Sequence, residues 1–258
     1  GDQIIELDRD TKDILWSWST FDYFSMEDYD TLGNEWQFAL SFLRYDWTHC
    51  NSLWFDEEEN TILLSSRHLS RVTKIDYLTG EIIWNMGVEM PSGQVDFGTD
   101  LCFSYQHSIT QLENGNLLLL DNGNLSPYYC NTEHPVTRAL EISIIEEEGD
   151  YNAELMWEYI LPDNFAGRFM GSCERLPNGN TLITPGGLIP NIGKAFEVTS
   201  DNEIVWELEA STTVNQIFRI SGLYPQKFSI IQPNFVWYLP TPTMYLPLGD
   251  NTISYTIY

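Results

Sequence analysis

The chain has 258 residues, of which 43% are hydrophobic and nine are tryptophans. A chain of this length and composition can bury a substantial core. Asp and Glu number 38 against 12 Lys and Arg, and the resulting net charge of −26 argues strongly against a nucleic-acid or anionic-membrane partner. No run approaches the roughly 18–20 apolar residues of a membrane span, so we expect no membrane insertion.

The first predicted element in the chain is a pair of strands over residues 4–18. Neither an initiator Met nor a signal peptide precedes it at Gly1, so we expect a chain that is processed or cut from a longer one. After a long connection, residues 49–67 read as two apolar runs around a tight turn, which predicts a β-hairpin. Residues 71–87 add two more strands and complete a unit of four.

The same four-strand unit recurs twice further along the chain. Residues 107–123 and 138–161 form the second unit, and residues 171–187 and 194–210 form the third. A tryptophan lies in the last strand of each unit and of the opening pair: Trp16, Trp84, Trp157 and Trp206. Four antiparallel strands per unit predict the blades of an all-β β-propeller.

The number of units is small for a closed ring. About three and a half blades are visible, whereas propellers close with roughly four to eight. We therefore interpret residues 1–228 as the C-terminal part of a propeller whose earlier blades are absent from this chain. Residues 229–258 contain four prolines and then the alternating TISYTIY, which predicts a linker and the edge strand of a further β module.

Loop lengths predict where function lies. The turns inside each hairpin are short, whereas the long connections all fall on the opposite face of the propeller: 19–46, 88–104, 123–137, 162–170 and 185–193. Elaborated loops on a rigid β scaffold usually carry the functional site, so we expect the site on this face.

Acidic residues and cysteines give weaker signals. The acidic turns, such as 56–59 and 146–150, are typical of solubility, with calcium binding as the minor alternative because the ligand spacing of an EF-hand is absent. Of the four cysteines, Cys102 and Cys130 would bridge two loops in an exported protein, and the alternative is four buried thiols. Without a Cys-x-x-Cys pair we expect no zinc site, and no metal is predicted.

Two histidines occupy equivalent places in consecutive units. His49 and His107 each precede a first strand at the channel mouth, Gly171 is the third member of the set, and Arg67 ends the strand beside His49. Two imidazoles and a guanidinium converging there predict an anion site, although a single histidine is more often structural. His68 should face the opposite way on the strand.

Several stretches carry a family resemblance: DWTHCNS (46–52), LLSSR (63–67), IDYLTGEIIWNMG (75–87), YQHSITQLENGNLLLLDNG (105–123) and FRISGLYP (218–225). Together they resemble the bacterial aryl sulfotransferases that use no nucleotide donor. The resemblance covers roughly residues 1–228 and implies a six-bladed, secreted or periplasmic propeller without a cofactor. It implies ping-pong transfer of a sulfuryl group from an aryl sulfate to a phenol.

The resemblance also assigns roles to residues. His107 matches the nucleophile that becomes a sulfohistidine, and His49 and Arg67 match the groups that hold the sulfuryl oxygens. Asn51, Asn122 and, more weakly, Thr184 are the predicted substrate-binding residues, and Gly171 is interpreted as leaving room for the substrate. The family has a further histidine on an earlier blade, which this chain does not carry; His134 lies in a loop and does not match it.

The sequence also allows two other interpretations. The spacing Asp76-x-x-Thr79-Gly80-x-x-x-Trp84 resembles the tryptophan-docking repeat of quinoprotein propellers, where it packs blades, so we take it as structural. The alternative function is a non-catalytic secreted or surface propeller that binds glycan or protein partners. Either the remainder of a longer chain or a second copy could be a further partner. Loop aromatics could serve either function or only packing: Tyr23, Phe24, Trp36, Tyr128 and Tyr129.

Overall fold

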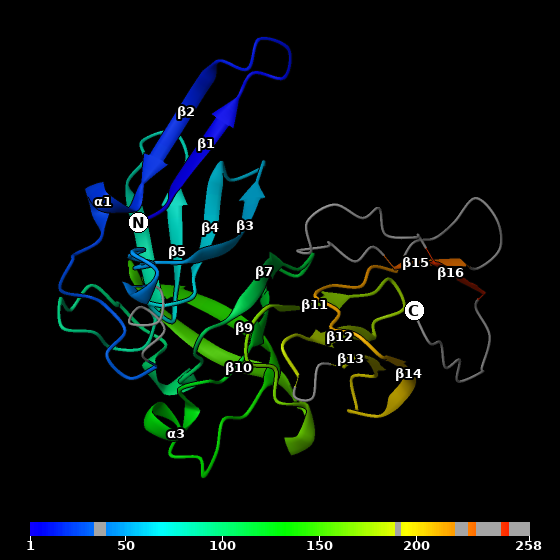
Figure 1. Cartoon of the computed structure of the whole chain (residues 1–258). Coiled ribbons are helices and arrows are strands. Elements are labelled where there is room, and N and C mark those ends of the chain that lie inside the picture. The colour runs from blue at the N-terminus through cyan, green and yellow to red at the C-terminus, as the bar shows by residue number, and fades with distance from the viewer. Residues whose placement is uncertain (34–39, 189–191, 220–226, 231–243, 248–258) are drawn as a thin grey trace.

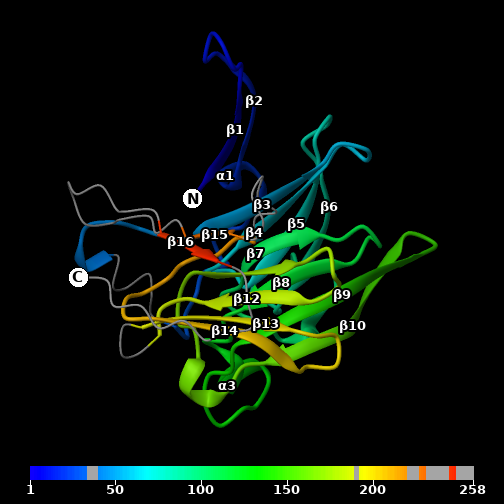
Figure 2. The same cartoon turned by 90° about the vertical axis from the view of Figure 1, so that its right-hand side faces the viewer.

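The computed structural model describes residues 1–33, 40–188, 192–219, 227–230 and 244–247. The fold is all-β, with three four-stranded antiparallel sheets and two two-stranded ones (Figures 1 and 2). The first complete sheet is β3(Cys50–Asp56), β4(Thr61–Ser66), β5(Arg71–Asp76) and β6(Ile82–Gly87). The second is β7(His107–Gln111), β8(Leu117–Asp121), β9(Arg138–Glu147) and β10(Asp150–Ile160). The third is β11(Gly171–Arg175), β12(Thr181–Pro185), β13(Gly193–Val198) and β14(Ile204–Ala210).

The remaining elements are short. The hairpin β1(Gln3–Leu7) and β2(Ile14–Ser19) precedes the first complete sheet, and β15(Lys227–Ile230) pairs with β16(Met244–Pro247) near the C-terminus. Four helical turns that lie wholly within the described residues are found in connections: α1(Thr20–Tyr23), η1(Thr99–Leu101), α3(Ser126–Tyr129) and η2(Asp163–Phe165). No helix within the described ranges is both long and apolar enough to cross a membrane. The segment TISYTIY lies outside the described residues.

The predicted blades are confirmed, strand by strand. Each complete sheet contains four strands in chain order, and the predicted tryptophans lie in the last strand of their units. The first strands of successive blades lie side by side: Ile109 N on β7 donates to Ser52 Oγ on β3 at 3.0 Å. Ser108 Oγ on β7 donates to Cys173 O on β11 at 3.3 Å. These contacts place the starts of the three first strands around one end of the stack.

The core lies between the blades rather than inside any one of them. Along β8, Leu117 and Leu119 pack in the cluster shared with the first blade, whereas Leu118 and Leu120 pack in the cluster shared with the third. All four are at most 3% exposed. Alternate side chains of a strand point to opposite faces, so a strand between two blades must be apolar throughout, as this run of leucines is.

Equivalent polar contacts repeat from blade to blade. Asn116, in the turn between β7 and β8, donates to Glu141 at 2.7 Å, and Arg175 of the next blade contacts the same carboxylate group at 2.7 Å. Asn180 and Arg219 contact Glu197 in the same way, at 2.7 and 2.6 Å. Arg219 therefore has the same position relative to the third blade that Arg175 has relative to the second.

Tryptophans also dock on neighbouring blades. The indole N–H of Trp18 donates to Gly80 O at 2.9 Å, and that of Trp157 donates to Ser200 O at 3.1 Å. The carbonyls that accept lie in the turns before the last strands of the following blades. This geometry supports the structural interpretation of the Asp76–Trp84 spacing.

The predicted cysteine bridge is present. Cys102 and Cys130 form a disulfide with a Cα–Cα distance of 5.6 Å, and it ties the loop after η1 to α3. Cys50 and Cys173 are free thiols. The bridge joins two of the long connections on the predicted functional face.

Candidate functional site

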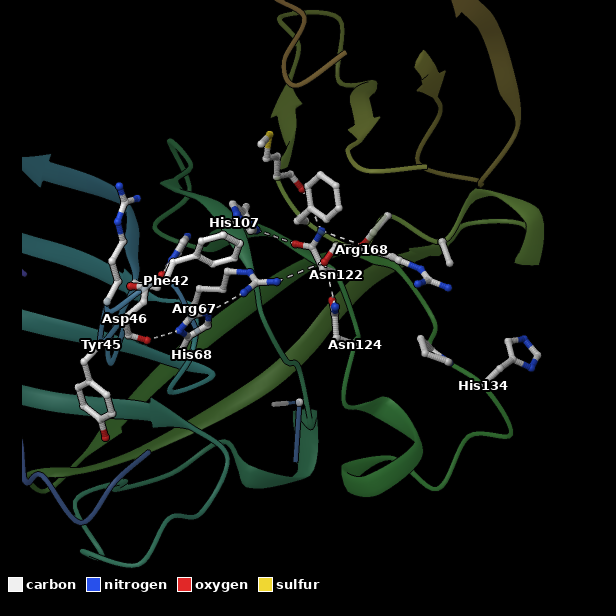
Figure 3. A pocket seen from close by; sticks show the side chains of 18 of the residues that line it. Phe42, Tyr45, Asp46, Arg67, His68, His107, Asn122, Asn124, His134 and Arg168 are labelled. Atoms are coloured by element: carbon white, nitrogen blue, oxygen red, sulfur yellow. Dashed lines mark hydrogen bonds and ion pairs between the residues drawn. The ribbon is translucent and has the colours of Figure 1, made fainter. Parts of the chain in front are cut away.

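A cavity of about 1590 Å³ opens where the long connections converge (Figure 3). Residues from the connections before β3, before β9 and before β11 line it, together with the ends of β4 and β8 and the start of β7. The cavity therefore lies on the long-loop face, where the sequence predicts the site. Of the predicted site residues, the wall contains His49, Arg67, His107 and Asn122.

His107 is the first residue of β7, and hydrogen bonds to Nδ1 fix which of its two ring nitrogens carries the hydrogen. Its Nδ1 lies 2.7 Å from Asn122 Oδ1 and 3.1 Å from Tyr105 O. The backbone carbonyl can only accept, so Nδ1 carries the hydrogen and donates it. Nε2 is then the nitrogen with a lone pair, the form that a nucleophile requires.

Asn122 is oriented by two further hydrogen bonds. Its Nδ2 donates to Gly167 O and to Met170 O, each at 2.9 Å. Because the amide nitrogen is occupied by two acceptors, the oxygen must face His107. Asn122 therefore fixes the tautomer of His107 and ties the loop before β11 to the end of β8, which makes it a supporting residue of the site.

Burial keeps His107 neutral. Desolvation, opposed by the hydrogen bond to Asn122 and reinforced by the charge of Arg67, lowers the pKa of His107 to about 4. At neutral pH the imidazole therefore needs no deprotonation before it can attack an electrophile.

Arg67 is buried and fixed from several sides. Its guanidinium carbon lies 4.2 Å from the centre of the Tyr105 ring, a cation–π geometry. Nη1 donates to His68 Nε2 at 2.7 Å, and Nη2 donates to Arg168 O at 3.3 Å (Figure 3). The guanidinium is thus pre-positioned at the cavity wall rather than free to swing.

His68 belongs to the site, and the prediction that it faces the other way was wrong. β4 ends at Ser66, and residues 67–70 form a turn, so the strict alternation of a strand no longer applies. Nε2 accepts from Arg67, and Nδ1 donates to Asp46 O at 2.7 Å. Burial, then the charge of Arg67, lowers the pKa of His68 to about 4, so this ring is neutral and can act as an acceptor.

Asp46 organises both neighbouring histidines. Its carbonyl accepts from His68, and its carboxylate Oδ2 lies 2.5 Å from His49 Nδ1. The hydrogen bond from His49 holds the pKa of Asp46 below its ordinary value. His49 Nδ1 is occupied, so Nε2 is the nitrogen available to a ligand. The spacing Asp-x-x-His in DWTHC was the sequence signal for this pair, and it was overlooked.

The same trio has metal-binding residue types. One ligand atom from each of Asp46, His49 and His68 lies within 4.8 Å of the others. The hydrogen-bond pattern does not fit a bound cation, because His68 Nε2 accepts from the Arg67 guanidinium and Nδ1 donates to a carbonyl. A cation there would displace one of these bonds and face the positive charge of Arg67. We therefore assign the trio to hydrogen bonding.

Asn51 lies behind the cavity wall and supports the residue before His107. Its Nδ2 donates to Gln106 O at 2.7 Å, and the buried Gln106 amide donates to Ser65 Oγ at 3.1 Å and to Arg71 O at 2.9 Å. These bonds clamp the residue before His107 to the first blade. Asn51 does not contribute to the described cavity wall.

Thr184 and Gly171 also do not contribute to the described cavity wall. Thr184 is fully buried on β12. Gly171 does not leave room for a substrate: a Cβ there would lie 2.5 Å from Leu120 Cδ2 and 2.6 Å from Thr184 O. With φ at +105°, Gly171 is required by close packing and backbone conformation instead.

Aromatic residues in the cavity differ from those predicted. Phe42, Tyr45 and Phe169 line it and are partly exposed. Tyr23 stacks on Trp18 with ring centres 4.8 Å apart, and Phe24 is buried, so both serve packing. Tyr128 and Tyr129 do not contribute to the described wall, and Trp36 lies outside the described residues.

With this geometry established, comparison with known proteins gives the family. Residues 1–219 match the arylsulfotransferase (ASST) family. The chain belongs to the arylsulfotransferase family. No curated protein matches it.

Solved structures similar to this arylsulfotransferase chain are distant. They include a protein of unknown function from Bacteroides caccae, with 16% identity and a TM-score of 0.37, covering 86% of this chain and 76% of that one. A streptogramin B lyase has 17% identity and a TM-score of 0.36, covering 64% and 41%. The Dos1 propeller has 10% identity and a TM-score of 0.33, covering 66% and 49%. The chain thus spans less than half of the last two.

Proposed function

We propose that this chain transfers a sulfuryl group from an aryl sulfate ester to a phenol through a sulfohistidine at His107. The observation that carries the proposal is the hydrogen bonding of His107. Nδ1 donates to Asn122 and Tyr105, and Nε2 is left as a nucleophile on a cavity wall that also holds Arg67. Family membership supports small aromatic substrates.

In the first half-reaction, the Nε2 lone pair of His107 attacks the sulfur of the aryl sulfate. The bond from sulfur to the aryl oxygen breaks, and the phenolate leaves with the bonding electrons. Transfer of this kind depends mainly on positioned positive donors around the equatorial oxygens, a role that suits Arg67. Its planar fork is held in place by His68 and Arg168 O.

His49 supplies the proton that the exchange requires. With the Asp46 carboxylate on Nδ1, the ring can carry a second proton on Nε2 and donate it to the leaving phenolate. In the second half-reaction the acceptor phenol returns its proton to His49, its oxygen attacks the sulfur, and the N–S bond electrons return to His107 Nε2. Atoms and charge then balance over the cycle, and no nucleotide takes part.

An extracytoplasmic location belongs to the same proposal. The Cys102–Cys130 disulfide supports it, because disulfides persist mainly in oxidising compartments.

Steady-state kinetics tests the proposed activity. With 4-nitrophenyl sulfate as donor and a phenol as acceptor, we expect 4-nitrophenol release that depends on acceptor and parallel double-reciprocal lines, as ping-pong transfer requires. His107→Asn should abolish release, whereas His134→Asn, at an exposed histidine on the same cavity wall, should retain it. Intersecting lines would contradict the ping-pong order. Absence of any release would leave a non-catalytic binding propeller as the better account.

A further inference from the structure

Half of the twelve positive side chains of this acidic chain are paired with carboxylates within the part that the structure describes. Six Lys and Arg side chains form ion pairs with Asp or Glu: Arg71, Lys74, Arg138, Arg175, Lys194 and Arg219. Arg44 and Arg168 form none with any carboxylate in the described ranges, and both line the cavity. In a protein with a net charge of −26, such cations are scarce, and their place in the cavity marks it as a site for anions.

Arg168 is the better defined of the two. Its carbonyl accepts from Arg67 Nη2 at 3.3 Å and from Asn124 Nδ2 at 2.9 Å, so its backbone is fixed while its side chain is exposed. In Figure 3 the Arg168 side chain extends toward His134, on the other side of Asn122 from Arg67. Asp163 also lines the cavity, and its Oδ1 lies 3.2 Å from His134 Nε2.

A simple aryl sulfate needs less positive charge than the cavity holds. The ester carries one negative charge, which Arg67 already offsets, while His107 attacks its sulfur and His49 serves the leaving oxygen. Arg168 lines the same cavity on the other side of Asn122 from Arg67, so we expect the remote end of an aromatic substrate to meet it. A guanidinium binds carboxylates and sulfates through two parallel N–H donors.

We propose that the cavity contains a second anion subsite centred on Arg168, which selects aromatic substrates that carry a carboxylate or a second sulfate besides the transferred group. This inference rests on the proposed function for the identity of the first group. It also assigns the long 162–170 connection a role in substrate choice.

Binding of two non-transferable sulfonates to the full chain tests the subsite. Benzenesulfonate carries one anionic group and 4-sulfobenzoate carries two, and neither has an ester bond to break. By titration calorimetry we expect about fivefold tighter binding of 4-sulfobenzoate, the scale of one partly exposed ion pair. Arg168→Gln should remove this preference and leave benzenesulfonate binding unchanged.

Arg9→Gln is the matched control. Arg9 lies in the exposed turn between β1 and β2 and outside the cavity, so the variant changes the net charge equally. Arg9→Gln should keep the preference for 4-sulfobenzoate. An equal loss of this preference in both variants would mean that it comes from long-range electrostatic attraction and not from a subsite. Equal affinity for the two sulfonates in the unaltered chain, or a preference that survives Arg168→Gln, would overturn the subsite.

The outcome is separable from the proposed activity. If the chain prefers 4-sulfobenzoate through Arg168 but releases no 4-nitrophenol from 4-nitrophenyl sulfate, sulfuryl transfer fails and the anion subsite stands. If transfer occurs without the preference, the subsite fails and the activity stands.

Discussion

Asn122→Ala removes the side chain that orients the proposed nucleophile. The asparagine makes three hydrogen bonds, one from His107 Nδ1 at 2.7 Å and two to loop carbonyls at 2.9 Å. Tyr105 O, at 3.1 Å, remains as an acceptor for Nδ1–H, so the required tautomer survives and only its orientation loosens. Loss of one to two such contacts corresponds to about 1–3 kcal/mol, or roughly a 5- to 150-fold slower first half-reaction.

The assay is the pre-steady-state burst of 4-nitrophenol from 4-nitrophenyl sulfate. We expect the burst rate to fall in Asn122→Ala with little change in burst amplitude. Asn116→Ala provides the control. Asn116 lies in the turn before β8, at the opposite end of that strand from Asn122, and donates a 2.7 Å hydrogen bond to Glu141 on β9. A burst rate in Asn122→Ala equal to that of Asn116→Ala would refute the assigned role.

Further predictions follow from the same contacts. His68→Ala should raise the KM for aryl sulfate about tenfold by releasing Arg67, and His68→Gln, which retains an acceptor, should restore much of the loss. The acid limb of kcat/KM should lie near pH 4 rather than 6.5, because burial lowers the pKa of His107 to about 4; a limb at pH 6.5 would contradict the burial argument. Because His68 and His107 stay neutral in the folded state while the unfolded chain protonates near pH 6.5, the free energy of unfolding should be highest above that pH. It should fall by a few kcal/mol as pH drops to about 4, as urea titrations would show. Asp28→Asn should lower the free energy of unfolding by about 3–5 kcal/mol, since it leaves the fully buried Arg71 without its 2.5 Å partner; an unchanged urea midpoint would contradict this.

The blades could be predicted because their physics is local. Alternating apolar residues, tight turns and a tryptophan in each last strand define a four-strand unit without reference to distant parts of the chain. The apolar run 117–120 was predicted as part of a hairpin, and in the structure it lies between two blades with both faces buried. The same repeat placed His49 and His107 at equivalent positions, and the structure brings both to one cavity.

The rest of the site depends on the long connections, whose paths no periodicity predicts. The alternation of side chains along a strand, when it was extended two residues beyond Ser66, predicted that His68 faces away from the site. The chain turns there instead, so the alternation no longer applies. Gly171 aligned with the histidines, but its neighbours fill the space that the alignment suggested. Arg168 lies outside the repeat, so only tertiary structure could assign it, whereas the Asp-x-x-His spacing before β3 was an overlooked signal for Asp46.

The most direct test of the central claim is the covalent intermediate on His107. The protein is mixed with 4-nitrophenyl sulfate without acceptor, quenched in alkali because an N–S bond to imidazole is labile in acid, and digested for peptide mass spectrometry. We predict one added sulfuryl group on the His107 peptide. This group should be missing when a phenol is added before the quench. A sulfuryl group on another residue, or transfer to phenol with no adduct at His107, would contradict the account.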